Sequence, residues 1–304
     1  MKNILLMFLP TVILLGGMFI VLFPALWLYR WKNSGRRSPL SRELLRSPGE
    51  SLREQIEEIS YDIDTVMVAS FTLPALSYAS FVSQLYFTNV KNPVQVFIFY
   101  LIITLLLTAF LIFRLSKKLT RRNELRLGLD AELAIGQELN QLMLNGYRVF
   151  HDFPADNFNI DHIVFGPDGV FAVETKGRAK PVKSDTKREW KVTFDGQALL
   201  FPNWTEREFL PQARRQAEWL AKWLSSAVGE QVQVRPVLAL PGWYIDRLKP
   251  SDVYLFNGKN PLAWAGKKLE APLSDSLIQR IAHQIEQKCR DVEPSAYKKE
   301  KKSN

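Results

Sequence analysis

The chain has 304 residues and a formal net charge of +9, and 47% of its residues are hydrophobic. Its single cysteine, Cys289, excludes an internal disulfide and a multi-cysteine zinc site, and three histidines argue against a histidine-rich metal centre. The positive charge is concentrated in segments 30–53, 114–122 and 298–302, and the rest of the chain is net negative. Charge alone is therefore weak evidence that the body of the protein binds nucleic acid.

Two long uncharged segments predict membrane helices. Residues 4–29 contain no charged side chain and exceed the roughly 20 residues that cross a bilayer. Basic residues follow from Arg30, so the positive-inside rule places the N-terminus outside and the next segment in the cytoplasm. Residues 94–113 form a second uncharged, aliphatic and aromatic segment.

A third segment, 65–87, is ambiguous because it is uncharged but contains Pro74 and several hydroxyl side chains. The alternative is a buried or interfacial helix pair. Two spans would leave the basic segments 30–53 and 114–122 on opposite sides of the membrane, whereas three spans place both in the cytoplasm. Neighbouring helices can satisfy the carbonyl that Pro74 leaves free. We therefore expect three spans.

Residues 1–122 are thus predicted to be an all-α membrane region with a cytoplasmic loop over 30–64. The expected location is a membrane, in bacteria the inner membrane, with a multi-pass topology and a cytoplasmic C-terminal domain over 123–293. The bilayer is then one partner; the sequence identifies no protein partner. Residues 294–304 form a charged tail of the composition typical of disorder.

The C-terminal domain is predicted to open with an amphipathic helix over 123–144, since its leucines recur at helical spacing. Asn145-Gly146 marks its end. Glu132 lies on the core-facing side of this helix; the alternative is a surface residue at the edge of the apolar stripe. A first strand is expected over 147–153.

Residues 161–176 predict a β-hairpin. Gly166-Pro167-Asp168-Gly169 is a turn sequence, and apolar, β-branched and aromatic runs flank it. If Phe165 faces Val170, Asp161 lies directly opposite Glu174, with Cβ atoms about 5 Å apart. Lys176 shares the face of Glu174 because side chains alternate along a strand.

This hairpin brings two carboxylates and an amine together. Both strands are apolar on both faces, which indicates a buried hairpin. Buried carboxylates need a partner, and a divalent cation with oxygen ligands provides one. A nearby lysine can hold a water or stabilise charge on a phosphate. The alternative is an edge hairpin with a surface Glu-Lys pair.

The remaining predicted elements follow in chain order. They are a hairpin over 190–201 with an Asp195-Gly196 turn, a helix over 211–224, strands over 232–240 and 253–256, and a closing helix over 274–289. Gln212 and Gln216 are neighbours on the first of these helices; the alternative is an ordinary solvated surface. We expect an α/β domain with a mixed sheet covered by helices on both faces.

The hairpin resembles the core of the NERD (nuclease-related) domain, a family of the PD-(D/E)XK restriction-endonuclease-like superfamily. The matching residues are Ile160-Asp161-His162, the turn followed by Val170-Phe171, and Glu174-Thr175-Lys176. Gly128 and Glu132 upstream match the family's Gly-x-x-x-Glu helix opening, and Gln212 and Gln216 downstream are similar to its later glutamine-bearing helix. The resemblance covers roughly residues 124–245.

The resemblance implies a restriction-endonuclease-like fold and a metal-dependent phosphodiesterase. Asp161, Glu174, the Thr175 carbonyl and Glu132 would hold Mg²⁺ or Mn²⁺. Lys176 would position water or stabilise negative charge, and Gln212 and Gln216 would point to the site. DNA is the expected substrate, because the superfamily mostly cuts DNA.

Two other classes of function stay open at this point. The same fold without turnover would be a membrane-tethered module that binds nucleic acid or protein. A purely structural membrane protein would leave the buried hairpin unexplained. The sequence contains no Walker loop, no Gly-x-Gly-x-x-Gly, no Gly-x-Ser-x-Gly and no His-Glu-x-x-His, so NTPase, dehydrogenase, α/β-hydrolase and zincin functions lack support.

Overall fold

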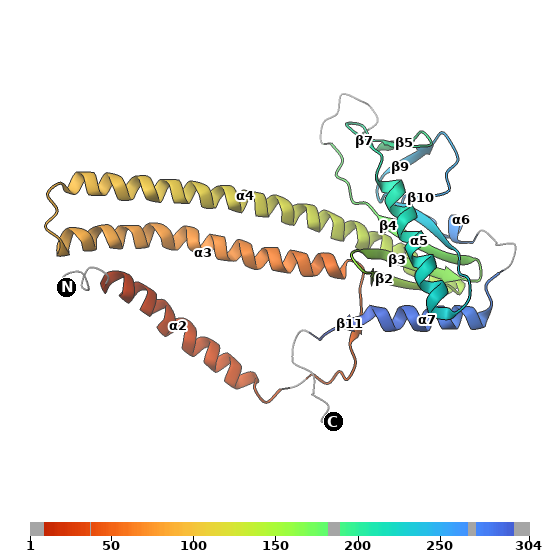
Figure 1. Cartoon of the computed structure of the whole chain (residues 1–304), viewed down its shortest axis with the longest axis horizontal. Coiled ribbons are helices and arrows are strands. Elements are labelled where there is room, and N and C mark those ends of the chain that lie inside the picture. Colours follow the sequence, from red (N-terminus) through yellow and green to blue (C-terminus); the bar gives the residue numbers. More distant parts are fainter. Residues whose placement is uncertain (1–8, 37, 182–188, 267–271, 295–304) are drawn as a thin grey trace. The chain divides into compact units, whose positions relative to one another are not determined.

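The computed structural model describes residues 9–36, 38–181, 189–266 and 272–294 (Figure 1). The chain divides into two compact units. The helical unit includes the described residues of Met1–Pro39 and Glu57–Asn123, and the α/β unit includes those of Leu40–Ile56 and Glu124–Ser295.

The helical unit is built from helix α2 (Leu9–Asn33) and the parts of α3 (Glu50–Phe87) and α4 (Pro93–Asn140) that belong to it. Helices α3 and α4 lie side by side, because the Ser77 and Thr104 hydroxyls are 2.5 Å apart and the Phe81 and Phe97 rings are 5.5 Å apart. Most of their large apolar side chains are exposed.

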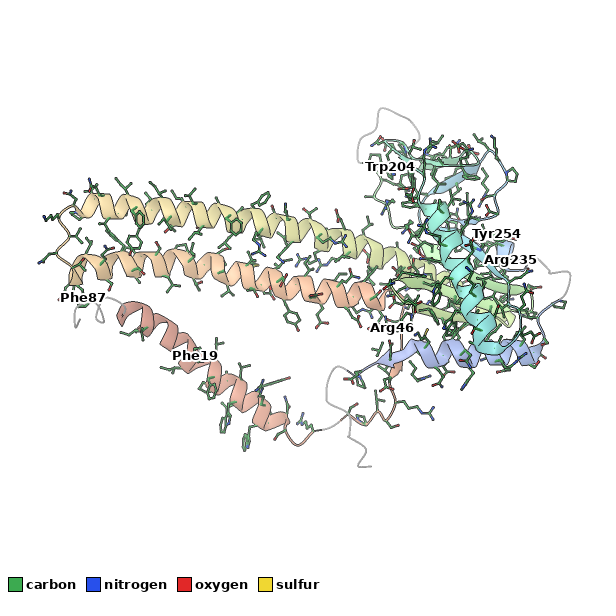
Figure 2. The ribbon with its side chains drawn as sticks, viewed as in Figure 1. Phe19, Arg46, Phe87, Trp204, Arg235 and Tyr254 are labelled. Atoms are coloured by element: carbon green, nitrogen blue, oxygen red, sulfur yellow. The ribbon has the colours of Figure 1, made fainter. Side chains whose placement is uncertain are left out.

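Two helices in the described part of the chain are long and apolar enough to cross a membrane by length and composition, α3 and α4 with its 3₁₀ extension η1 (Gln141–Asn145). They contain the expected spans 65–87 and 94–113. The expected span 4–29 begins among residues outside the described ones and continues in α2. Helix α2 is not one of these two. Its Phe19 side chain is exposed and projects from the helix (Figure 2).

The α/β unit contains the predicted mixed sheet, with strand order β10-β8-β4-β3-β2. Strands β10, β8 and β4 are parallel, and β4, β3 and β2 are antiparallel. The strands are β2 (Arg148–Pro154), β3 (Asn159–Gly166), β4 (Gly169–Thr175), β8 (Val234–Ala239) and β10 (Tyr254–Phe256). The predicted hairpin is β3-β4, at the centre of this sheet.

The register of the hairpin is the predicted one. Phe165 pairs with Val170 and His162 with Val173. Every residue of β4 is buried, which confirms that this strand is covered on both faces. The alternation of two apolar faces and the tight turn therefore suffice to define this part of the fold.

Helices cover both faces of the mixed sheet. On one face α5 (Phe209–Val228) and α7 (Asp275–Cys289) pack on Phe165 and Ala172, as Figure 1 shows for the two helices. On the other face, the end of α4 and the short α6 (Leu262–Ala265) pack on Phe171 and Val173. The expected α/β fold with a helix-flanked mixed sheet is confirmed.

A smaller sheet has the order β7-β6-β5-β9. Its strands are β5 (Lys191–Phe194), β6 (Leu199–Leu200), β7 (Thr205–Glu206) and β9 (Tyr244–Arg247). The β5-β6 hairpin was predicted; its turn is held by Asp195 Oδ1, which accepts from the Gln197 and Ala198 amides at 2.8 Å. Strand β9 was not predicted, because its short sequence lacks a clear alternation.

Residues 40–56 lie within the cytoplasmic loop predicted over 30–64. They belong to the α/β unit, where β1 (Leu44–Leu45) pairs with β11 (Arg290–Val292). The Arg46 guanidinium donates to Asp152 at 2.6 Å. Helix α3 then begins at Glu50. The polar sequence gave no sign of this docking, because its partners lie far away in the chain.

Candidate active site

The site begins where the β3-β4 hairpin opens at the end of β4. The observed pairing ends at His162 and Val173, and Asp161 and Glu174 are the next residues along the two neighbouring strands. Asp161 is half-buried, and its Oδ2 accepts from the Thr175 backbone amide at 2.6 Å. Glu174 is only 3% exposed. The hairpin therefore holds two carboxylates in an environment with little water.

Glu174 has one engaged and one unengaged oxygen. Its Oε1 accepts from Gln212 Nε2 at 2.7 Å and lies 2.5 Å from Lys176 Nζ. Its Oε2 is buried and has no hydrogen-bond partner among the described residues. Lys176 Nζ also lies over the Phe209 ring, 5.3 Å from its centroid. The strand, helix α5 and the lysine thus fix one oxygen and leave the other available.

Glu132 is the third carboxylate and comes from α4, beyond that helix's apolar segment. It is 7% exposed, and its Oε2 also lacks a partner within the described chain. Burial, followed by the charges of Asp152 and Glu174, raises the pKa of Glu132 to about 8, against the opposing effects of Lys176 and the Gly49 amide. The core-facing placement predicted from the leucine spacing is confirmed.

Burial and neighbouring charges also shift the pKa of Asp161. Burial, then the charges of Glu174 and Glu132, raise the pKa of Asp161 well above its ordinary value, while the Thr175 amide and Lys176 lower it. The carboxylates therefore repel one another when ionised, and one lysine does not compensate them. A site of this kind favours an additional positive charge.

Both predicted glutamines of α5 face the same site. Gln212 donates to Glu174, as described above. Gln216 is 4% exposed; its Nε2 donates to the Asn159 carbonyl at 3.4 Å, and its Oε1 has no partner in the described part of the chain. The alternative of a solvated helix surface is wrong for Gln216, whose side chain is buried.

These residues line one cavity of about 470 Å³, which we call the active-site cavity. Glu132, Asp161, Glu174, Gln212 and Gln216 all contribute to its wall. Thr175 and Lys176 adjoin it through their contacts with Asp161 and Glu174. The structure thus brings together all seven residues that the sequence singled out.

Sequence reasoning missed the contribution of residues 40–56. Ser51, Leu52 and Gln55, at the start of α3, also line the active-site cavity. Ser51 is held by Asp152, which is 1% exposed and accepts from Arg46, from the Ser51 amide at 2.9 Å and from the Ser51 hydroxyl at 2.6 Å. Only the polar, charged character of Asp152 within an apolar strand could have drawn attention to it.

The donor set suits a hard divalent cation. In the described residues, no group of three or more His, Cys, Asp or Glu side chains already forms a metal site. Nevertheless, Glu132 and Glu174 each present a buried, unpartnered carboxylate oxygen, and Asp161 lies beside them in the cavity wall. Carboxylate and carbonyl oxygens are the ligands that Mg²⁺ prefers. The residues therefore fit Mg²⁺ or Mn²⁺ by chemistry, charge and availability.

Comparison with known proteins agrees with the resemblance seen in the sequence. Residues 127–241 match the family model of NERD, described as a nuclease-related domain. No curated protein and no solved structure matches the chain. The matched residues include Glu132, the β3-β4 hairpin and α5 with both glutamines. Residues 127–241 of this chain are therefore a nuclease-related domain.

Proposed function

We propose that the protein is a membrane-anchored, metal-dependent nuclease that hydrolyses phosphodiester bonds, with DNA as its substrate. One observation carries the proposal: Glu132, Asp161 and Glu174 line a single cavity, with Lys176 bonded to Glu174, inside the nuclease-related segment. A surface Glu-Lys pair would need neither the burial of Glu174 nor the buried third carboxylate.

The metal ligands would be Asp161, Glu174, the Thr175 carbonyl and Glu132. When bound, Mg²⁺ or Mn²⁺ would act as a Lewis acid on the phosphodiester oxygen and would lower the pKa of its bound water. The protein's part is to hold these oxygens on rigid elements. Asp161 is fixed by the Thr175 amide, and Glu174 by the Gln212 side chain.

Lys176 would act on the reacting phosphate. Its ammonium group is anchored by Glu174 Oε1 and remains 18% exposed at the cavity. An ammonium in this position stabilises negative charge that develops on phosphate oxygens, or orients the attacking water. Gln216, whose amide oxygen has no partner among the described residues, would accept a hydrogen bond from that water.

Membrane anchoring is supported by the length and composition of α3 and α4 and by the exposure of their apolar side chains. The basic segments 30–53 and 114–122 are the observation that supports a cytoplasmic α/β unit. A multi-pass protein of the bacterial inner membrane with its nuclease domain in the cytoplasm is the arrangement we propose.

The proposal is tested with the full chain in detergent, incubated with labelled single- and double-stranded DNA and RNA in Mg²⁺, Mn²⁺ or EDTA. We expect metal-dependent cleavage of DNA that is lost in Glu174→Ala and in Lys176→Ala. Glu218→Ala and Lys222→Ala are matched controls, since both residues are exposed on α5 outside the cavity lining. Cleavage that survives in Glu174→Ala with EDTA present would reject the mechanism.

The alternative is a catalytically inactive module that binds nucleic acid or protein. One observation favours it: the described residues contain no preassembled group of three metal ligands. This alternative predicts that DNA is retained by the wild-type protein but never cut under any metal condition.

A further inference from the structure

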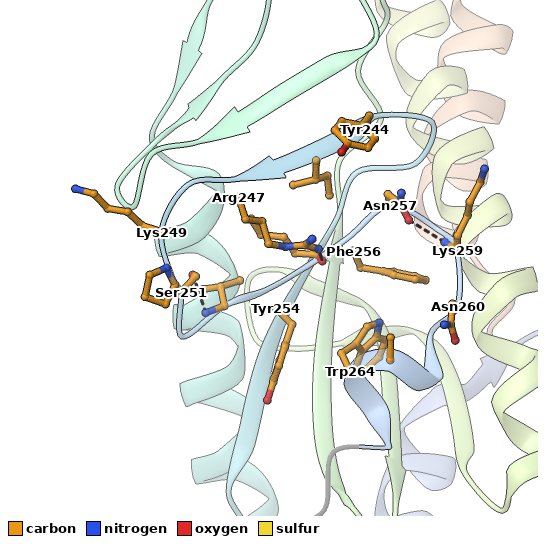
Figure 3. A pocket seen from close by; sticks show the side chains of 15 residues that line it. Tyr244, Arg247, Lys249, Ser251, Tyr254, Phe256, Asn257, Lys259, Asn260 and Trp264 are labelled. Atoms are coloured by element: carbon orange, nitrogen blue, oxygen red, sulfur yellow. Dashed lines mark hydrogen bonds between the residues drawn. The ribbon is translucent and has the colours of Figure 1, made fainter.

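A second cavity lies in the α/β unit between β9, β10 and α6 (Figure 3). Its volume is about 810 Å³, within the usual range of small-molecule sites. It shares no lining residue with the active-site cavity. Phe256, at its wall, pairs in register with Ala239, which pairs with Thr175. The cavity therefore lies near the carboxyl ends of the parallel strands, where ligands of α/β sheets commonly bind.

The lining of this cavity is cationic. Arg247, Lys249 and Lys259 contribute to it, and the described lining contains no Asp or Glu. In Figure 3 Arg247 lies in the middle, with Lys249 and Lys259 on opposite sides. The neighbouring acid Asp246 is paired with Lys191 at 2.5 Å, and Asp252 with Arg214 at 2.7 Å. An anion would therefore meet uncompensated positive charge.

Lys249 also interacts with Asp195, whose pKa it helps to lower after the backbone hydrogen bonds from Gln197 and Ala198. Arg247 uses one N–H to donate to the Leu255 carbonyl. A guanidinium has five N–H donors, so most of those of Arg247 stay available to a ligand. Arg247 and Lys259 thus contribute most to the recognition of an anion.

Trp264 provides an independent sign of a ligand. It lines the cavity and is 5% exposed, yet its indole Nε1 has no acceptor among the described residues. The rings of Phe171 and Phe256 fix the indole, with centroids 5.0 and 5.6 Å away. Buried tryptophan N–H groups normally have a partner, so this donor calls for an acceptor oxygen or nitrogen.

Tyr244 adds an aromatic surface at the opposite end of the cavity (Figure 3). Its ring is 54% exposed and is supported edge-to-face by Trp190, 5.2 Å away. Exposed aromatic rings beside cationic side chains are the arrangement on which nucleic-acid bases stack while phosphates meet the positive charge. A simple inorganic anion would not need the ring.

We propose that this cavity binds a nucleoside phosphate, with the base on Tyr244 and the phosphate held by Arg247 and Lys259. Trp264 donates its indole N–H to an oxygen or nitrogen of the same ligand. The ligand is either a free nucleotide or one nucleotide of a single strand, because both present the same chemistry. The site is independent of hydrolysis and does not require the metal.

The test is equilibrium binding to the full chain in detergent with EDTA, which prevents cleavage at the other site. Probes are a nucleoside monophosphate, a short single-stranded oligodeoxynucleotide and inorganic phosphate. We expect Trp264→Phe and Lys259→Gln each to weaken binding by about threefold to tenfold, with Lys222→Gln unchanged. Lys259 is exposed, so its variant should fold even if Trp264→Phe does not.

A monophosphate that displaces the oligonucleotide identifies a free nucleotide as a ligand, whereas binding of the oligonucleotide alone identifies a strand. Equal affinity for inorganic phosphate, no binding by the wild type, or binding that neither variant weakens would overturn the proposal. Binding of the probes is measured in EDTA and without cleavage, so failure here is distinguishable from failure of the proposed nuclease.

Discussion

The helical unit and the α/β unit use their side chains in opposite ways. In the helical unit large apolar residues face outward, such as Phe71 at 77% and Leu106 at 66% exposure. In the α/β unit most large apolar residues are buried, and so are the acids Glu132, Asp152 and Glu174. The first arrangement is stable in lipid, and the second is stable only if the buried charges find partners. The stability of the helical unit therefore depends on its environment. The stability of the α/β unit depends on specific contacts of its buried acids.

The largest expected effect concerns the buried carboxylates. Asp161→Asn should lower the rate of DNA cleavage at least about a hundredfold, because one oxygen ligand and one negative charge are lost. The same variant should keep or raise the melting temperature, because it removes repulsion among Glu132, Asp161 and Glu174. Cleavage kinetics and thermal unfolding of the wild type and of Asp161→Asn measure the two effects, with Glu218→Gln as the control.

If Asp161→Asn lowers both the melting temperature and the rate of DNA cleavage, the carboxylate serves the fold and not the chemistry. The comparison between the two units would then lose its functional meaning.

A second test breaks the docking of residues 40–56 onto the α/β unit. Asp152→Ala removes the buried acceptor of Arg46 and Ser51, and we expect a loss of about 3 kcal/mol in the free energy of unfolding. Asp291→Ala, which removes an exposed partner of the same arginine, should cost less than about 1 kcal/mol. Denaturant titration of the full chain in detergent measures both; equal losses would contradict the assigned role of Asp152.

The helical unit offers the opposite experiment. Leu106→Asp places a charge on an exposed apolar surface and should oppose membrane insertion by about 3 kcal/mol, whereas Leu106→Ala should have little effect. The fraction of protein that resists alkaline extraction from membranes is the readout. Equal extraction of both variants would show that this surface does not face lipid.

The smallest effect concerns a buried histidine pair next to the site. His151 Nδ1 lies 2.9 Å from His162 Nδ1, and burial lowers the pKa of His151 from 6.5 to about 4. Between these values the unfolded chain binds a proton that the folded chain does not, so His151 lowers stability as the pH falls from 6.5 towards 4.

The His151→Gln variant should therefore lose less stability than the wild type on acidification, by roughly 2 kcal/mol between pH 6.5 and 5. Glu132 has the opposite dependence because its pKa is raised, but it is present in both proteins and cancels in the comparison. Melting temperatures across this range provide the measurement. Parallel pH profiles would mean that folding does not lower the pKa of His151.

The elements that could be predicted from the sequence are those specified by residues close together in the chain. The turn at Gly166–Gly169 and two apolar faces specify the β3-β4 register, and the leucine spacing places Glu132 inside. Contacts between distant polar residues could not be predicted. The bonds between Arg46 and Asp152, between His151 and His162, and the cavity around Arg247 depend on the assembled fold.

The central claim is that Glu132, Asp161 and Glu174 form a metal site, and calorimetry with Mn²⁺ tests it most directly. The full chain in detergent at pH 7 would be titrated in two buffers of different ionisation enthalpy. We predict that Mn²⁺ binds and releases protons, because the pKa of Glu132, raised to about 8, keeps a proton that the ion must displace. Binding should be lost in Glu174→Ala and kept in Glu218→Ala. Absence of Mn²⁺ binding to the wild-type protein, or unchanged binding in Glu174→Ala, would contradict the account.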